Sequence, residues 1–345
     1  MKANPSRSSH TPPQSSYQPP SGGIFTIIPP AWVPYAELMR LDRPAGYFAF
    51  IWHYLIGIGF GAALISPRLS PITIAGATIY LGVWVIVLRG AVCTVNDNLD
   101  QEFDRQVART RWRPIARGAV STTQANLFAA TQFVILAVMA VKCPFRQSPE
   151  ATAIPVYATL TAVILSVYPL GKRVTDMPQL ILGVGFAAAI PYAAAMVGLD
   201  PFDLDGRGVL TQDESHSLAT SCLSLCVACA IWTVIFDTIY AHQDREDDIK
   251  AGVRSLAVRL GDNTKLACAV MTTAQVALLV FTGVQCQFSS VYFVSCAGVA
   301  LALTVMLVKV DLRSAASCAW CFGKGTGIVG VILLAGLFGE YLIMK

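Results

Sequence analysis

Acidic residues are concentrated in two short stretches of this chain. Residues 96–104 read NDNLDQEFD and residues 237–248 read DTIYAHQDREDD, and together they hold nine of the 21 Asp and Glu residues. In the first stretch Asn96, Asp100 and Asp104 recur every four residues. On an α-helix this spacing advances only about 40° per step, so it predicts three oxygen-bearing side chains on one face.

The second stretch repeats the spacing at Asp244 and Asp248 and carries Asp237 about two helical turns earlier. Two carboxylates about 6 Å apart repel by roughly 3 kcal/mol at an effective dielectric near 20, so such faces attract cations. Mg²⁺ prefers one or two carboxylates together with waters and phosphate oxygens. Two Asp-bearing helix ends that face each other therefore predict a site for a Mg²⁺-bound diphosphate. The alternative interpretation is a solvated loop that is merely acidic.

Basic residues suited to phosphate oxygens lie in two further motifs. RTRWRP supplies Arg109 and Arg113, and YPLGKR supplies Lys172 and Arg173. A guanidinium donates paired hydrogen bonds to phosphate, and an ammonium attracts it as a point charge. We expect these four side chains to bind the diphosphate.

The composition places this chemistry in a membrane. The chain has 345 residues, of which 54% are hydrophobic and only 13% charged, with a mean hydropathy of +0.57. An ordinary soluble domain carries about a quarter charged residues, so a water-soluble protein is excluded and the lipid bilayer is the expected solvent. The net charge of +4 is small. Neither nucleic acid nor an obligate protein partner is indicated.

Nine apolar segments are long enough to cross a bilayer. They are residues 45–66, 71–93, 127–145, 152–170, 178–198, 217–240, 266–285, 289–310 and 324–343. Every backbone group in hydrocarbon must be hydrogen-bonded within its own segment, so runs of this length predict helices. The ten cysteines lie mostly inside these runs and are expected to pack as small apolar residues. For the C-x-x-C at Cys318 and Cys321 we favour packing over a metal or redox role.

The distribution of basic residues predicts the orientation. With the N-terminus in the cytosol, twenty of the 25 Lys and Arg residues fall on the cytosolic side, as the positive-inside rule requires. Both acidic stretches then lie on that side. Residues 1–34 are rich in Pro, Ser and Gln and are expected to form a disordered tail before a single transmembrane domain at 35–345.

The sequence around these motifs resembles the UbiA family of intramembrane prenyltransferases. The matching stretches read NDNLDQEFDRQVARTRWRPIARGAVS (96–121), YPLGKRVTDMPQLILGVGF (168–186) and WTVIFDTIYAHQDREDDIKAGVRSLAVRLG (232–261). The resemblance implies an all-α integral membrane protein whose nine transmembrane helices form a bundle of two similar halves. It also implies a polar cavity on the cytosolic side that opens laterally toward lipid.

The resemblance assigns roles to individual residues. The metal and diphosphate motifs are Asn96, Asp100 and Asp104 in the first half and Asp244 and Asp248 in the second. The four aspartates, together with Tyr168, are the expected catalytic residues. Arg109, Arg113 and Lys172 match diphosphate-binding positions, and Tyr168 matches a residue beside the allyl group. Asp97, Asp237 and Asp247 lie inside the motifs with less defined roles, and Arg43 resembles an arginine near the acceptor or the diphosphate.

Two histidines are secondary candidates. His242 lies among the acids of the second stretch and could accept a proton or simply hydrogen-bond to its neighbours. His53 lies in the first span, where packing is the more common role, although a cavity-facing ring could contact the carboxylate of the acceptor.

The chemistry follows from charge. Mg²⁺ and the basic residues stabilise the departing diphosphate, and the allylic carbon becomes cation-like in an apolar cavity with little water. An electron-rich phenolic acid then attacks this carbon. We favour a fungal meroterpenoid enzyme that adds a farnesyl group to an orsellinic-acid-like acceptor, because PYAELMRLDRPAGYFAF (34–50) is closer to that type.

Three alternatives stay open at the level of sequence. A 4-hydroxybenzoate polyprenyltransferase of ubiquinone biosynthesis shares the same motifs. A non-aromatic acceptor, or cyclisation of the isoprenoid, would use the same scaffold. An ion-coupled transporter also carries intramembrane acids, but at the bilayer midplane. We expect an endomembrane such as the endoplasmic reticulum or Golgi, with the mitochondrial inner membrane as the alternative.

Overall fold

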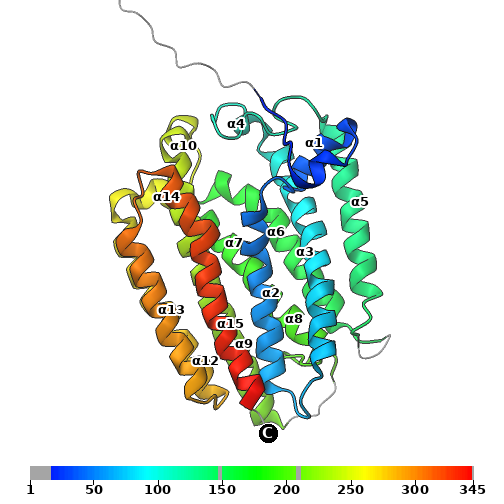
Figure 1. The fold of residues 1–345 in the computed structure, drawn as a ribbon, viewed down its shortest axis with the longest axis vertical. Coiled ribbons are helices and arrows are strands. Elements are labelled where there is room, and N and C mark those ends of the chain that lie inside the picture. The colour runs from blue at the N-terminus through cyan, green and yellow to red at the C-terminus, as the bar shows by residue number, and fades with distance from the viewer. Residues whose placement is uncertain (1–16, 147–149, 207–210, 344–345) are drawn as a thin grey trace, which may run out of the picture.

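The computed structural model describes residues 17–146, 150–206 and 211–343, and these ranges fold as helices joined by short loops (Figure 1). The α-helices are α1 (Val33–Leu38), α2 (Pro44–Leu64), α3 (Pro71–Leu99), α4 (Gln101–Asp104), α5 (Thr122–Val141), α6 (Ala153–Val174), α7 (Pro178–Ala187), α8 (Ala189–Met196), α9 (Gln212–Ala241), α10 (Arg245–Ala251), α11 (Leu256–Leu260), α12 (Thr264–Gln285), α13 (Ser290–Lys309), α14 (Ala315–Trp320) and α15 (Thr326–Ile343). Shorter helical turns are η1 (Gly23–Thr26), η2 (Pro30–Trp32), η3 (His242–Asp244), η4 (Gly261–Asn263) and the π-helical η5 (Cys321–Gly325).

Within this described part of the chain, nine helical segments are long and apolar enough to cross a membrane, which confirms the nine predicted spans. They are Pro44–Leu64, Pro71–Leu99, Thr122–Val141, Ala153–Gly171, Pro178–Met196, Gln212–Ala251, Leu256–Gln285, Ser290–Lys309 and Ala315–Ile343. The short helices α4 and α10 lie at the same end of the bundle (Figure 1). The two acidic stretches therefore meet on one side.

Several predicted boundaries differ from the observed ones because apolar windows do not detect helix caps. The third span begins at Thr122, five residues before the predicted 127, since Ser121 and Gln124 form a reciprocal capping box. The sixth span begins at Gln212, five residues before the predicted 217, because Thr211 and Glu214 form a second capping box. The second continues to Leu99, six residues beyond the predicted end. That extension carries the first acidic motif into the helix.

The fifth span is broken into α7 and α8. Pro191 has no N–H to donate to the carbonyl of Ala187, four residues earlier, and this is where the two helices meet. The thiol of Cys226 donates to that carbonyl at 3.5 Å. A neighbouring helix therefore satisfies the group that the proline leaves unpaired.

The centre of the bundle is formed by α2, α7, α8 and α9. Trp84, Trp232 and Tyr192 are among the largest fully buried side chains there. α2 packs against α8 and α15, while α9 packs against α7 and α12. Gly57 lets the backbones of α2 and α8 approach closely, because an added Cβ would lie 2.4 Å from the carbonyl oxygen of Ile190.

The predicted tail, residues 1–34, falls partly outside the described residues, which begin at 17. From there the chain contains η1 and η2 and makes tertiary contacts. The hydroxyl of Tyr17 donates to Glu37 Oε1 at 3.0 Å, and its ring lies 4.0 Å from the guanidinium carbon of Arg117. The segment from Tyr17 onward is therefore attached to the loop that follows the first acidic motif.

Candidate active site

The first acidic motif bridges the end of α3 and the short helix α4. The helix axis breaks at Asp100, yet the amide of Asp100 donates to the carbonyl of Asn96 and the amide of Asp104 to the carbonyl of Asp100, both at 2.8 Å. The four-residue hydrogen-bond spacing thus continues through the break. All three side chains line the same cavity, as the sequence spacing predicts.

The second motif follows the end of α9 through a tight turn. α9 ends at Ala241, η3 carries Asp244, and α10 carries Asp248. Asp237 lies one turn inside α9. These three aspartates line the cavity opposite the first motif.

The cavity between the motifs has a volume of about 470 Å³, within the range of small-molecule sites. Its mouth is polar, with the two motifs and several arginines. Tyr168 of α6 also lines it, as predicted. The deeper wall is apolar and aromatic, and it includes Phe50, Leu182, Phe186 and Phe236. The site therefore offers a charged end and an apolar end.

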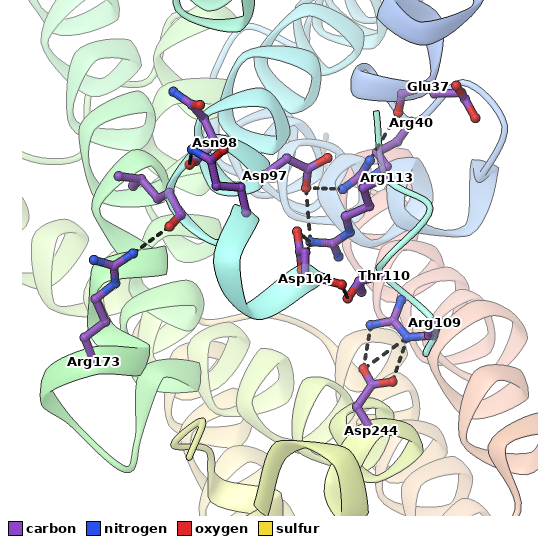
Figure 2. Close-up of polar contacts among 12 residues, drawn as sticks. Glu37, Arg40, Asp97, Asn98, Asp104, Arg109, Thr110, Arg113, Arg173 and Asp244 are labelled. Atoms are coloured by element: carbon purple, nitrogen blue, oxygen red, sulfur yellow. Dashed lines mark hydrogen bonds and ion pairs between the residues drawn. The ribbon is translucent and has the colours of Figure 1, made fainter. Parts of the chain in front are cut away.

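An ion pair joins the loop after the first motif to the second motif across the cavity (Figure 2). Arg109 donates to Asp244 from Nε at 2.8 Å to Oδ1 and from Nη2 at 2.5 Å to Oδ2. Burial of the guanidinium disfavours its charge, but the hydrogen bonds and charge of Asp244 outweigh this, and the pKa of Arg109 is raised. The arginine predicted to bind diphosphate therefore already binds a carboxylate.

A second set of ion pairs runs from α1 to the first motif (Figure 2). Arg113 donates to both Asp104 oxygens, at 3.0 and 2.9 Å, and lies 3.1 Å from Asp97 Oδ1. Asp97, which is 0% exposed, also accepts from Arg40 at 2.5 Å. Burial opposes the charge of Arg113, but Asp97 and Asp104 outweigh it and raise its pKa. Asp97 thus holds two arginines that line the cavity.

Arg40 and Arg89 are functional candidates that the sequence analysis did not single out. Arg40 adopts a left-handed backbone (φ 59°) at the turn after α1. Arg89, inside α3, stabilises this turn by donating to the carbonyl of Arg40 at 3.0 Å and that of Arg43 at 2.7 Å. Gly46 leaves room for it, since an added Cβ would lie 2.5 Å from Arg89 Nη2. A buried charge within an apolar span was the available signal.

Arg43 lines the cavity mouth, where its Nε lies 3.1 Å from Asp42 Oδ2. Five candidates whose side chains are described do not line the cavity: Asp97, Arg173, Asp247, His53 and His242. Arg173 is exposed and donates to the carbonyl of Leu99 at 2.5 Å (Figure 2). Asp247 lies 3.9 Å from Lys250 on the outer side of α10.

The two histidines each bond to a threonine hydroxyl. His242 Nε2 bonds to the hydroxyl of Thr264 at 2.9 Å. His53 is fully buried beneath the cavity, where its Nε2 lies 3.0 Å from the hydroxyl of Thr233. Lys172 belongs to α6, and its side chain is outside the described part of the structure.

The cavity mouth has a donor set of the type that Mg²⁺ uses. Its candidate ligands, one Asn and four Asp, are all hard oxygen donors. Among the described residues, no three His, Cys, Asp or Glu side chains form a metal cage by themselves. Mg²⁺ does not require one, because it is bound through one or two carboxylates plus substrate phosphates. The residues present therefore fit a metal that is shared with a diphosphate.

Comparisons with known proteins agree with this geometry. The family model described as "UbiA prenyltransferase family" matches residues 51–333. The prenyltransferase stbC of Stachybotrys bisbyi is 33% identical over 96% of this chain and 94% of its own, and the DMOA farnesyltransferase nvfB of Aspergillus novofumigatus is 38% identical over 71% of each. A UbiA homolog from Archaeoglobus fulgidus, solved with GPP and Mg²⁺, has a TM-score of 0.64 at 17% identity, covering 90% of this chain and 100% of that one.

The matched residues include both acidic motifs and most of the residues that line the cavity between them. The fold, the motif spacing and the relatives thus lead to one conclusion: this chain belongs to the UbiA prenyltransferase family and is an enzyme that transfers a prenyl group.

Proposed function

We propose that this enzyme transfers a farnesyl group from its diphosphate to an aromatic carbon of a phenolic acid, such as an orsellinic acid derivative, in meroterpenoid secondary metabolism. The observation that carries the proposal is the convergence of two aspartate motifs and their arginines on a cavity whose far wall is apolar. A charged leaving group and a hydrocarbon chain need such opposite surroundings. The name of the farnesyltransferase relative supports the choice of chain.

The residues have separate tasks at the diphosphate. Asn96, Asp100, Asp104, Asp244 and Asp248 would hold Mg²⁺, which supplies positive charge to the diphosphate when bound. Arg109 and Arg113 donate to the phosphate oxygens, which requires them to share or leave their carboxylate partners. As the bond between the allylic carbon and the diphosphate oxygen breaks, the electron pair leaves with the diphosphate.

The apolar part of the cavity protects the resulting carbocation. Tyr168, expected beside the allyl group, offers an aromatic face that attracts a cation, while the apolar wall excludes water that would quench it. A ring carbon of the acceptor then forms the new C–C bond to the allylic carbon. That carbon then loses its proton to the departed diphosphate, and the ring regains its aromaticity.

We propose the cytosolic side for this site, with the N-terminus in the cytosol and residues 35–345 acting as one transmembrane domain after the tail at 1–34. The excess of Lys and Arg on the motif side supports this orientation. The surrounding membrane is an endomembrane in this proposal.

The test is product formation by microsomes that contain the chain. Geranyl, farnesyl and geranylgeranyl diphosphate are each paired with orsellinic acid or 4-hydroxybenzoate, and mass spectrometry detects every adduct. We expect farnesylated orsellinic acid, lost with EDTA, restored by Mg²⁺ and absent in Asp100→Ala and Asp244→Ala. Asp213→Asn, an exposed change at the start of α9, should keep activity. Prenylated 4-hydroxybenzoate alone would refute the acceptor and indicate the quinone pathway.

A further inference from the structure

The deep end of the cavity is closed by a cluster of aromatic rings. The rings of Phe50 and Phe186 lie 4.4 Å apart between their centroids, and Phe236 is 6.4 Å from Phe186. The Phe186 side chain comes from α7 and is only 4% exposed, yet it lines the cavity. An apolar chain that runs down the cavity from the acidic mouth would therefore meet these rings.

The depth of the cavity can be measured along α7. Pro178 and Phe186 both line it, and eight residues at 1.5 Å per residue span about 12 Å. An isoprene unit adds four main-chain bonds, and an extended chain of such bonds advances about 1.2 Å per bond, so each unit needs about 5 Å. The depth accordingly matches two to three units, which is a geranyl or farnesyl chain.

The space beneath Phe186 is filled. Its ring lies 5.2 Å from the ring of His53, which stacks at 5.4 Å on Trp232, and both of these side chains are fully buried. One turn below His53, Gly57 brings α2 against the backbone of α8 at Ile190. A longer chain could gain only the volume that the Phe186 ring now occupies.

We propose that Phe186, set against Phe50, is the stop that fixes the longest prenyl chain this enzyme accepts. The inference rests on the proposed function, since it specifies the donor substrate of the same site. It commits to a prenyl chain that descends between α2, α7 and α9. A chain that leaves sideways into lipid would not contact this ring.

Two variants should change the longest accepted prenyl chain in opposite directions. Phe186→Ala removes six carbon atoms, and an isoprene unit adds five, so the opened space is close to one unit. Leu182 lines the same wall one turn nearer the mouth, and Leu182→Phe adds three carbon atoms without creating a void. Phe288→Ala is the matched control, because Phe288 is a buried ring, packed on Tyr292, at the junction of α12 and α13.

The measurement is kcat/KM for the C10, C15 and C20 diphosphates with a fixed acceptor. Pockets discriminate by at least about tenfold for a single methylene, so Phe186→Ala should raise the C20 to C15 ratio by tenfold or more. Leu182→Phe should raise the C10 to C15 ratio, and Phe288→Ala should leave both ratios unchanged. Unchanged ratios in both test variants would overturn the inference and favour a lateral exit.

Binding separates this inference from the proposed function. Affinities of the three diphosphates are measured on the purified full-length proteins in detergent with Mg²⁺, without any acceptor. If wild type forms no product, the proposed reaction is refuted, while the order of affinities still decides the role of Phe186. An affinity for the C20 compound that rises in Phe186→Ala relative to the C15 compound supports the stop, and equal changes for both contradict it.

Discussion

Asp97 is the position at which a single change should disturb both the fold and the site. Its carboxylate is completely buried and lies 2.5 Å from Arg40 and 3.1 Å from Arg113. Asp97→Asn keeps the shape of the side chain but removes the charge that compensates two buried guanidinium groups. Arg113 retains Asp104, whereas among the described residues Arg40 retains the carbonyl of Glu37 at 3.2 Å.

The expected cost follows from these partners. Removing one member of a buried ion pair typically destabilises a protein by about 3–5 kcal/mol, because the remaining charge is left uncompensated. Since Arg113 keeps one carboxylate, we expect the lower end, about 3 kcal/mol. Arg113 would then be held by Asp104 alone and less firmly positioned toward the diphosphate, so the KM for the prenyl diphosphate should rise.

The assay is unfolding of the purified protein in mixed micelles, with prenyl transfer measured in parallel. Asp213→Asn is the control, since an exposed change is usually worth less than about 0.5 kcal/mol. The double variant Asp97→Asn, Arg40→Met should recover part of the loss, because it no longer buries an unpaired guanidinium. A loss below about 1 kcal/mol for Asp97→Asn, or no recovery in the double variant, would refute the reasoning.

Three further predictions address other contacts. Arg109→Lys should raise the KM for the diphosphate by about tenfold, as a lysine cannot replace the two-pronged contact, and steady-state kinetics would detect this. Gly46→Val should displace the Arg89 guanidinium and lower the melting temperature, whereas Gly22→Val, which meets nothing within 4 Å, should not. Burial, with the charge of Glu37, raises the pKa of Tyr17 to about 12. Its stabilising contribution is therefore complete below pH 10 and lost as pH rises toward 12, so the melting temperature of wild type should fall more steeply there than that of Tyr17→Phe.

The sequence predicted the spans and the two motifs well because both depend on short-range periodicity. Nine apolar runs of bilayer length leave little choice of structure, and the four-residue spacing of Asn96, Asp100 and Asp104 survives even where α3 gives way to α4. The same holds for Asp244 and Asp248, which reach the cavity although a tight turn separates them from α9.

Contacts between distant segments could not be predicted in this way. The charge distribution of the sequence uses Arg89 only as one more basic residue, whereas its two hydrogen bonds to the α1–α2 turn depend on how α3 packs against that turn. The same limit applies to Tyr17, whose partners lie 20 and 100 residues away. Arg173 shows the opposite case. Its position in the sequence suggests a diphosphate ligand, but in the structure its side chain donates to the carbonyl of Leu99.

The charges that line the cavity explain why a metal belongs to the proposed reaction. Among the described lining residues, five aspartates face six arginines, so the site is nearly neutral as it stands. Two of these arginines, Arg109 and Arg113, hold Asp244 and Asp104. A diphosphate that recruited them alone would leave those carboxylates unpaired beside a highly charged anion, which is costly in a partly buried site. In the proposed reaction a divalent cation would compensate both the anion and the released carboxylates, so we expect the ion pairs that order the cavity to make anion binding depend on Mg²⁺.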